Sequence, residues 1–116
     1  MKTLRVKLDK RGYPIIVGQG VIRQAGTLLA GIGFNSPPVI VTNSRVWRLH
    51  GEELRRSLSA SFGPSAVIRI GDGERFKNHE TLRRIYEGLF QAHADRRSWV
   101  LAFGGGVIGD IAGFAA

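Results

Sequence analysis

The chain has 116 residues, of which 43% are hydrophobic and 22% charged, a composition typical of one globular domain and not of a disordered segment. It contains no cysteine, which excludes disulfides, thiolate metal sites and a cysteine nucleophile. Its formal net charge is +8, but the basic residues are scattered along the sequence and are not interleaved with aromatic residues. We therefore expect them to lie on solvated helix faces and to steer an anionic ligand toward the protein. We do not expect nucleic acid as a partner.

The amino-terminal residues 1–7 mix apolar and basic side chains and lack the apolar core of a signal peptide. No apolar run along the chain approaches the roughly 18 residues that a membrane-spanning helix needs. We therefore expect a cytoplasmic protein with no membrane partner.

The first third of the chain predicts two strands and a helix. Apolar and polar residues alternate in Thr3–Leu8, which predicts a half-buried strand, and the apolar run Tyr13–Val17 predicts a second strand. The turn Lys10-Arg11-Gly12 separates them. We expect these strands to form a β-ribbon or an edge pair. Apolar residues recur at helical spacing from Val21 to Ala30, and Gly31-Ile32-Gly33 is expected to end that helix.

The middle of the chain predicts a strand, a helix and a strand. Val39–Thr42 is a β-branched strand, and Asn43-Ser44 after it suits the cap of a helix from about Arg45 to Ala60. Gly51 weakens the continuity of this helix, and Ala66–Ile70 is the next strand. The residues expected to face the core from the helix are Val46, Leu49, Leu54 and Leu58.

The polar loop Gly71–Asn78 leads into another helix. Asn78 is a good cap for a helix from His79 to about His93, after which Ala94–Ser98 forms a charged turn and Trp99–Phe103 an apolar strand. The apolar stripe of this helix is expected to be Leu82, Ile85, Tyr86, Leu89 and Phe90.

The glycine-rich segment Gly104–Asp110 follows that strand and opens a further helix. Its spacing from Gly104 to Gly109 matches G-x-G-x-x-G, in which glycine lets the backbone approach a phosphate and the first helical N–H groups point at it. A tight turn without a ligand would give the same pattern. Two features differ from the usual dinucleotide fingerprint: the match lies in the last strand–helix unit, and the acidic residue expected about 20 positions later is not in the chain.

Strands that alternate with helices predict an α/β fold, with a Rossmann-like, mostly parallel sheet and helices on both faces. We expect residues 1–116 to form one domain. Ligands of such sheets bind beyond the carboxyl ends of the strands, where three loops converge in this chain. These loops are Thr42-Asn43-Ser44, Asp72–Lys77 and Gly104–Asp110.

The second loop carries candidate groups for sugar recognition. Asp72 or Glu74 could accept hydrogen bonds from two ribose hydroxyls, and Lys77 could hold a phosphate or a hydroxyl, although a solvated turn would use the same residues. Asp110 would face a ligand held by the glycines, but a carboxylate near a helix N-terminus is also favoured by the helix dipole alone.

The three histidines do not form a metal site by their spacing. His79 and His93 would lie about 21 Å apart along one helix, and His50 belongs to another. No G-x-S-x-G elbow and no Ser/His/Asp set is present. We therefore expect neither catalytic nor metal-binding residues within this chain.

Four segments together resemble the amino-terminal domain of the 3-dehydroquinate synthase family. They are Tyr13-Pro14-Ile15-x-Val17-Gly18-x-Gly20, Val41-Thr42-Asn43, Asp72-Gly73-Glu74-x-x-Lys77 with Thr81-Leu82, and Gly104–Phe114. Related sugar-phosphate cyclases share most of these motifs, and glycerol-dehydrogenase-like metal-dependent oxidoreductases share the glycine loop, so both remain alternatives. A non-catalytic basic module that binds a nucleotide or nucleic acid is a third.

The resemblance implies that this domain binds NAD. The glycine segment would hold the pyrophosphate and the nearby ribose, the second loop would hold ribose hydroxyls, and Asn43 would lie near the adenosine end. The implied cofactor-binding residues are Asn43, Asp72, Gly73, Glu74, Lys77, Gly105, Gly106, Val107, Ile108, Gly109 and Asp110.

The resemblance also implies an activity for the full-length enzyme, which would be a homodimeric lyase of the shikimate pathway, in aromatic amino acid and chorismate biosynthesis. It would convert DAHP into 3-dehydroquinate and phosphate with NAD and a divalent metal, zinc or cobalt. The family's helical carboxyl-terminal domain, with one glutamate and two histidines as metal ligands, has no counterpart in these 116 residues. We therefore expect a fragment that ends within a helix and is inactive on its own.

Overall fold

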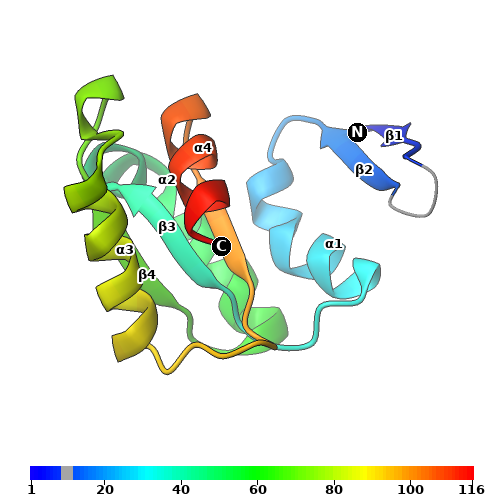
Figure 1. Ribbon diagram of the computed structural model, residues 1–116. Coiled ribbons are helices and arrows are strands. Elements are labelled where there is room, and N and C mark those ends of the chain that lie inside the picture. Colours follow the sequence, from blue (N-terminus) through cyan, green and yellow to red (C-terminus); the bar gives the residue numbers. More distant parts are fainter. Residues whose placement is uncertain (9–11) are drawn as a thin grey trace.

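The computed structural model describes residues 1–8 and 12–116 and contains two separate sheets (Figure 1). A two-stranded antiparallel ribbon lies beside helix α1, apart from a three-stranded parallel sheet flanked by helices. In chain order the elements are β1 (Lys2–Val6), β2 (Tyr13–Val17), the 3-10 helix η1 (Val21–Gln24), α1 (Ala25–Ile32), β3 (Val39–Asn43), α2 (Ser44–Phe62), β4 (Ala66–Ile70), the 3-10 helix η2 (Glu74–Phe76), α3 (His79–Gln91), β5 (Val100–Phe103) and α4 (Gly106–Ala115). The predicted α/β fold is confirmed.

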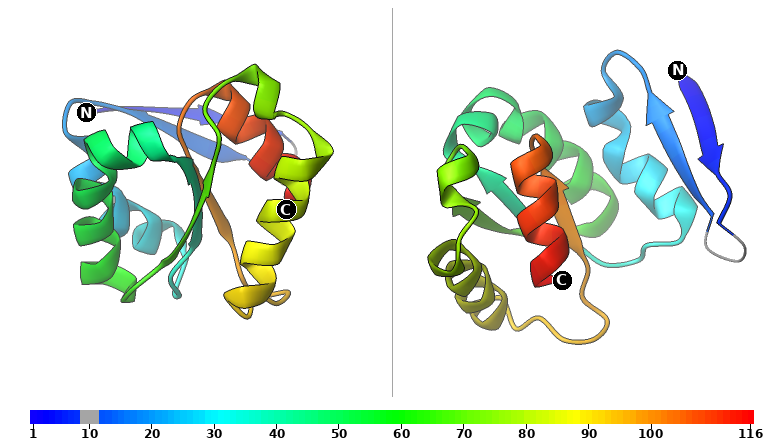
Figure 2. Two further views of the ribbon diagram at one scale, coloured as in Figure 1. Left: turned by 90° about the vertical axis from the view of Figure 1, so that its left-hand side faces the viewer. Right: turned by 45° about the horizontal axis from the view of Figure 1, so that its top comes forward.

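The parallel sheet has the order β4-β3-β5, so the first of its strands along the chain lies in the centre. All five residues of β3 are buried. Val39 and Val41 pack toward α3 and α4, whereas Ile40 packs toward α1 and α2. These two pairs of helices lie on opposite faces of the sheet (Figure 2). Because helices cover both faces, the first three residues of β3 are all apolar and do not alternate between apolar and polar residues.

The predicted boundaries of the strands and helices agree with the structure to within two residues. The first strand covers Lys2–Val6, where Thr3–Leu8 was predicted, and its antiparallel pairing with β2 confirms the predicted ribbon. The predicted helix of residues 21–30 is a 3-10 turn followed by α1, which ends at Ile32 and is capped by Gly33 with a φ of 125°. Residues 10 and 11 of the turn predicted between the first two strands lie outside the described part of the chain.

Asparagine side chains begin both long helices, as predicted. The Val46 N–H donates to Asn43 Oδ1 at 2.8 Å, and the Thr81 N–H donates to Asn78 Oδ1 at 2.9 Å. Each bond satisfies one of the N–H groups that the first helical turn leaves without a partner.

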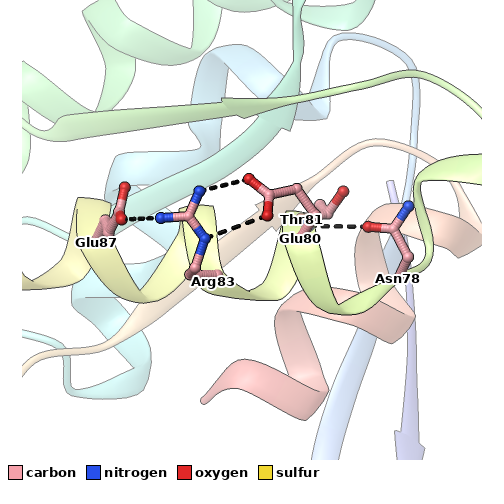
Figure 3. A network of polar contacts seen from close by, with 5 residues as sticks. All are labelled: Asn78, Glu80, Thr81, Arg83 and Glu87. Carbon is pink, nitrogen blue, oxygen red and sulfur yellow. Dashed lines mark hydrogen bonds and ion pairs between the residues drawn. The ribbon is translucent and has the colours of Figure 1, made fainter.

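The solvent face of α3 carries an ion-pair network. Arg83 lies between Glu80 and Glu87, one turn away on either side (Figure 3). The hydrogen bond from Arg83 lowers the pKa of Glu80 and raises the pKa of Arg83. These side chains are exposed, so the network contributes little to the stability of the chain.

The predicted inward stripes of α2 and α3 are wrong at three positions, because each helix packs along a line that includes a glycine. In α2 the Trp47 ring lies over Gly51, whose added Cβ would come within 2.4 Å of it, so the line continues to Leu54 and leaves Leu49 60% exposed. Gly51, which was expected to weaken this helix, lies within a continuous α2 from Ser44 to Phe62.

In α3 the packing line passes through Gly88, where an added Cβ would lie 2.6 Å from Ile68 Cδ1 on β4. Close contact at this glycine turns the neighbouring aromatic residues outward. Tyr86 is consequently exposed and Phe90 is 84% exposed, whereas Ile85 is fully buried as predicted.

Helix α1 packs on α2 through Gly26. Its N–H donates to Ser57 Oγ at 2.8 Å, and a Cβ on Gly26 would lie 2.1 Å from the Ser57 carbonyl oxygen. By contrast, a Cβ on Gly31 in the same helix would meet nothing within 4 Å in the part of the chain that the structure describes. Gly26 is thus the point where the two backbones meet.

Gly26→Ala should lower the free energy of unfolding by about 1–3 kcal/mol, because the new methyl group collides with backbone in α2. Gly31→Ala is the matched control and should raise it by roughly 0.5–1 kcal/mol, since alanine is the better helix former. Urea unfolding followed by circular dichroism measures both. Equal effects of the two substitutions would contradict the α1–α2 contact.

Candidate functional site

The three parallel strands end at the same edge of the sheet, at Asn43, Ile70 and Phe103. From β3 the chain turns into α2 on one face, and from β5 it turns into α4 on the other (Figure 2). The strand order therefore reverses between β3 and β5, which is where ligands bind in open α/β sheets. The three loops that the sequence singled out all begin at this edge.

A buried hydroxyl joins the ends of β3 and β5. Thr42 is fully buried, and its Oγ1 donates to the Phe103 carbonyl oxygen at 2.7 Å. Phe103 directly precedes the glycine segment, so this bond fixes the point at which the segment leaves the sheet. The sequence places Thr42 in a strand but contains no signal for a bond across 61 residues.

A buried amide joins the end of β3 to the loop after β4. Asn43 Nδ2 donates to Asp72 Oδ1 at 3.4 Å, while the Oδ1 of the same amide caps α2. Asn43 is only 5% exposed, whereas Asp72 lies at the surface. One side chain therefore serves two elements.

An ion pair joins the second loop to α4. Lys77 Nζ lies 2.8 Å from Asp110 Oδ2 and 4.0 Å from Glu74 Oε2. The hydrogen bond to Asp110 raises the pKa of Lys77, and the charges of Asp110 and then Glu74 raise it further. With the bonds of Thr42 and Asn43, this pair links all three loops along the sheet edge.

The glycine segment forms an open turn before α4. Gly104 has a φ of 157°, and a Cβ there would lie 2.7 Å from Ile108 Cγ1, so this position requires glycine. At Gly105, Gly106 and Gly109 an added Cβ would meet no atom of the described residues within 4 Å. Open space therefore lies over the backbone on this side of the turn.

Helix α4 begins differently from α2 and α3. Among the described residues, no side chain caps it. The first backbone hydrogen bond of the helix is the one that the Gly109 N–H donates to the Gly105 carbonyl oxygen at 3.1 Å. The N–H groups of residues 106–108 precede that bond and are available to an anion, which the helix dipole favours.

The structure brings together most of the residues expected to bind a cofactor. Asp72, Lys77 and Asp110 are exposed members of the linked loops, and Gly73 precedes η2 with a φ of 111°. Ile108 differs, because its side chain is buried in the core and leaves only its backbone for a ligand.

A groove of about 470 Å³ lies beside the Lys77–Asp110 pair. The groove runs between α3 and α4. Its other lining residues were not predicted as site residues. Leu82 has the helical spacing of a core residue, and Phe114 lies in an apolar segment. The other lining residues are Asn78, His79, Leu82, Ile111 and Phe114.

In residues 1–8 and 12–116, no three histidine, aspartate or glutamate side chains gather closely enough to hold a metal ion. The same residues contain no helix that is long and apolar enough to cross a membrane.

The sequence is similar over its whole length to part of a known enzyme. Residues 67–116 match the family model described as 3-dehydroquinate synthase N-terminal. All 116 residues align with the 3-dehydroquinate synthases of Pelotomaculum thermopropionicum, at 43% identity, and Pseudomonas fluorescens strain Pf0-1, at 49% identity. The chain covers 31% of each of these relatives, so it spans about a third of their length. The resemblance to the amino-terminal domain of this family is confirmed.

Two solved structures share the fold. A crystal structure of 2-deoxy-scyllo-inosose synthase matches 99% of this chain and 32% of its own length, with a TM-score of 0.84 and 23% identity. A second, of the same enzyme complexed with carbaglucose-6-phosphate, NAD+ and Co2+, has the same TM-score and identity and is covered to 31%. At this identity the likeness establishes the fold.

Asp110→Asn should lower the pKa of Lys77 toward its ordinary value, because it removes the charge that stabilises the ammonium group. A raised lysine pKa stabilises the fold at pH values below the unfolded pKa, and this contribution is lost as pH rises through the folded pKa. NMR titration of the Lys77 side chain measures the change. Glu74→Gln is the control and should have the smaller effect; an equal or larger effect would contradict the observed pairing.

Proposed function

We propose that this chain is the NAD-binding domain of a lyase of the 3-dehydroquinate synthase type. The observation that carries the proposal is the linked sheet edge, where three loops meet beside a helix N-terminus that no side chain of residues 1–8 or 12–116 caps. Identities of 43% and 49% to two synthases, against 23% to a 2-deoxy-scyllo-inosose synthase, favour the synthase reaction over that of a related cyclase.

In this proposal the glycine segment binds the pyrophosphate of NAD. The open space over Gly105, Gly106 and Gly109 lets the phosphates approach the backbone, and the N–H groups of Val107 and Ile108 donate to them. Asp110 follows at the same end of α4, within reach of the neighbouring ribose.

The second loop binds ribose hydroxyls through Asp72 and Glu74, with Gly73 between them. A carboxylate accepts hydrogen bonds from two adjacent hydroxyls, and the ammonium group of Lys77 donates to one. Asn43 belongs to this site at the end of β3, where it bonds Asp72. The pair of Lys77 and Asp110 keeps both groups at the mouth of the site before the cofactor arrives.

Bound NAD would supply a transient hydride acceptor for a substrate hydroxyl. The solved 2-deoxy-scyllo-inosose synthase that shares this fold was crystallised with NAD+ and Co2+, which supports a cofactor site on the fold. This chain's own residues bind and orient the cofactor. The full-length enzyme would be a cytoplasmic homodimer of the shikimate pathway that converts DAHP into 3-dehydroquinate and phosphate with zinc or cobalt.

Gly106→Val should weaken NAD binding at least about tenfold, because its methyl groups fill the space proposed for the pyrophosphate. Gly113→Val is the matched control: it also lies in α4 with nothing within 4 Å of its Cβ, about 10 Å further along the helix, and should leave the affinity unchanged. Isothermal titration calorimetry with NAD measures both dissociation constants. Unchanged affinity of the first variant would rule out this site.

The 116-residue chain should bind NAD but release no phosphate from DAHP, because its described residues bring no metal-ligand cluster together. The assay measures phosphate with DAHP, NAD and either zinc or cobalt, beside the full-length synthase of Pseudomonas fluorescens as the positive control. Metal-dependent phosphate release above the rate without protein would show that this expectation is wrong.

A further inference from the structure

Strand β4 forms one edge of the parallel sheet and is paired on one side only. All its residues pair with β3, and within residues 1–8 and 12–116 no backbone hydrogen bond from outside the sheet reaches Ala66–Ile70. In the left view of Figure 2 the strand runs between α2 and α3 with no described element across it. The backbone N–H and C=O groups that face away from β3 are therefore open to a further strand.

A groove follows this free edge along α3. It consists of two hollows, one of about 460 Å³ beside Gly88 and one of about 360 Å³ beside Phe76. Arg69 on β4 and Arg84 on α3 line both hollows, so these two side chains lie where the hollows meet. A strand edge that borders a groove is where peptide-binding domains add an extended segment to their own sheet.

The acidic residues of the groove already have a partner, whereas two of its arginines do not. Glu80 lines one hollow and Glu87 the other, and both bond Arg83 (Figure 3). In the part of the chain that the structure describes, Arg69 and Arg84 have no carboxylate within 4.0 Å. Three arginines beside two glutamates leave the groove with a positive charge, which favours an acidic occupant.

A second copy of the chain is a poor occupant for this edge. Pairing β4 of two copies would bring Arg69 and Arg84 of each copy near those of the other, and like charges across a strand pair are destabilising. The formal net charge of +8 on each copy adds to the repulsion. Charged side chains on a short edge strand protect against such self-pairing and leave the edge open to a segment of opposite charge.

We propose that the free edge of β4 is a docking site for an extended acidic segment of a partner protein, which adds as a further strand and places a carboxylate between Arg69 and Arg84. Side chains two positions apart in a strand lie on the same face, about 7 Å from each other. The residues two positions before and after the carboxylate therefore enter the two hollows. The hollow that Ile70 and Phe76 line accepts a small apolar side chain. This site does not depend on the proposed cofactor site.

The test uses the synthetic peptide acetyl-Thr-Val-Thr-Glu-Thr-Val-Thr-amide. Its side chains have the same order in both directions, so it fits a parallel or an antiparallel approach, and its β-branched residues favour an extended backbone. Titration into the isotope-labelled chain should shift the amide resonances of residues 67–71 with a dissociation constant on the order of 1 mM, while those of β1 and β2 stay unchanged. The same peptide with lysine in place of glutamate is the control and should shift none of them. Equal shifts with both peptides, or none at about 10 mM of the first, would overturn the proposal.

Amide hydrogen exchange separates strand addition from the binding of a carboxylate alone. With the glutamate peptide near saturation, the amides of β4 that face away from β3 should exchange at least about fivefold more slowly, because they are then bonded to the peptide. Acetate at the same concentration should leave their exchange unchanged. Resonance shifts without slower exchange would show that no strand is added, and the proposal would fail.

Substitutions test the two arginines. Arg69→Ala and Arg84→Ala should each raise the dissociation constant of the glutamate peptide about three- to fivefold, because each removes one cation beside the carboxylate. Arg48→Ala is the matched control: it removes an exposed arginine of α2 that lines neither hollow and makes the same change in net charge. Equal effects of all three substitutions would reduce the binding to general attraction by a basic chain and contradict the proposed site.

Charge reversal provides the final test. The double variant Arg69→Glu with Arg84→Glu should bind the lysine peptide at least about threefold more tightly than the glutamate peptide, since the charges at the centre of the groove are exchanged. A continued preference for the glutamate peptide would place the binding elsewhere. Shifts at residues 67–71 that depend on protein concentration without any peptide would show that a second copy occupies the edge, which would also refute the proposal.

Discussion

The complete burial of the central strand is the constraint on which the rest of the structure depends. With helices packed on both faces of β3, its side chains are almost entirely shielded from water, so its polar groups must find partners within the protein. Thr42 and Asn43 are those polar groups, and their partners belong to the neighbouring strand β5 and to the loop after β4. The need to satisfy two buried side chains therefore connects the three loops of the candidate site.

The helix beginnings at this edge fall into two kinds. Asparagine amides close the first turns of α2 and α3, and those turns are part of the scaffold. The first turn of α4 carries glycines with open space above them and no cap from the described residues. The N–H groups at the beginnings of α2 and α3 therefore have side-chain partners, whereas those at the beginning of α4 face solvent. The unpaired N–H groups of this edge are concentrated at α4.

Local chemistry made much of this fold predictable. The alternation of apolar strands and amphipathic helices, and the two asparagine caps, depend on neighbouring residues and were correct. The outward positions of Leu49, Tyr86 and Phe90 depend instead on close packing at Gly51 and Gly88, which spacing alone does not reveal. The meeting of the three loops could be predicted, because the strands of a parallel sheet end at the same edge. The pairing of Lys77 with Asp110 could not be predicted from the sequence and is visible only in the structure.

The sequence separations of the three linking contacts carry a consequence for folding. Asn43 and Asp72 are 29 residues apart, Lys77 and Asp110 are 33 apart, and Thr42 and Phe103 are 61 apart. Closing loops of this length costs chain entropy that only the assembled sheet offsets. The three contacts would therefore form late in folding, after all three parallel strands have paired. A chain in which β5 has not yet paired would contain the first two loops but would lack the glycine segment beside them.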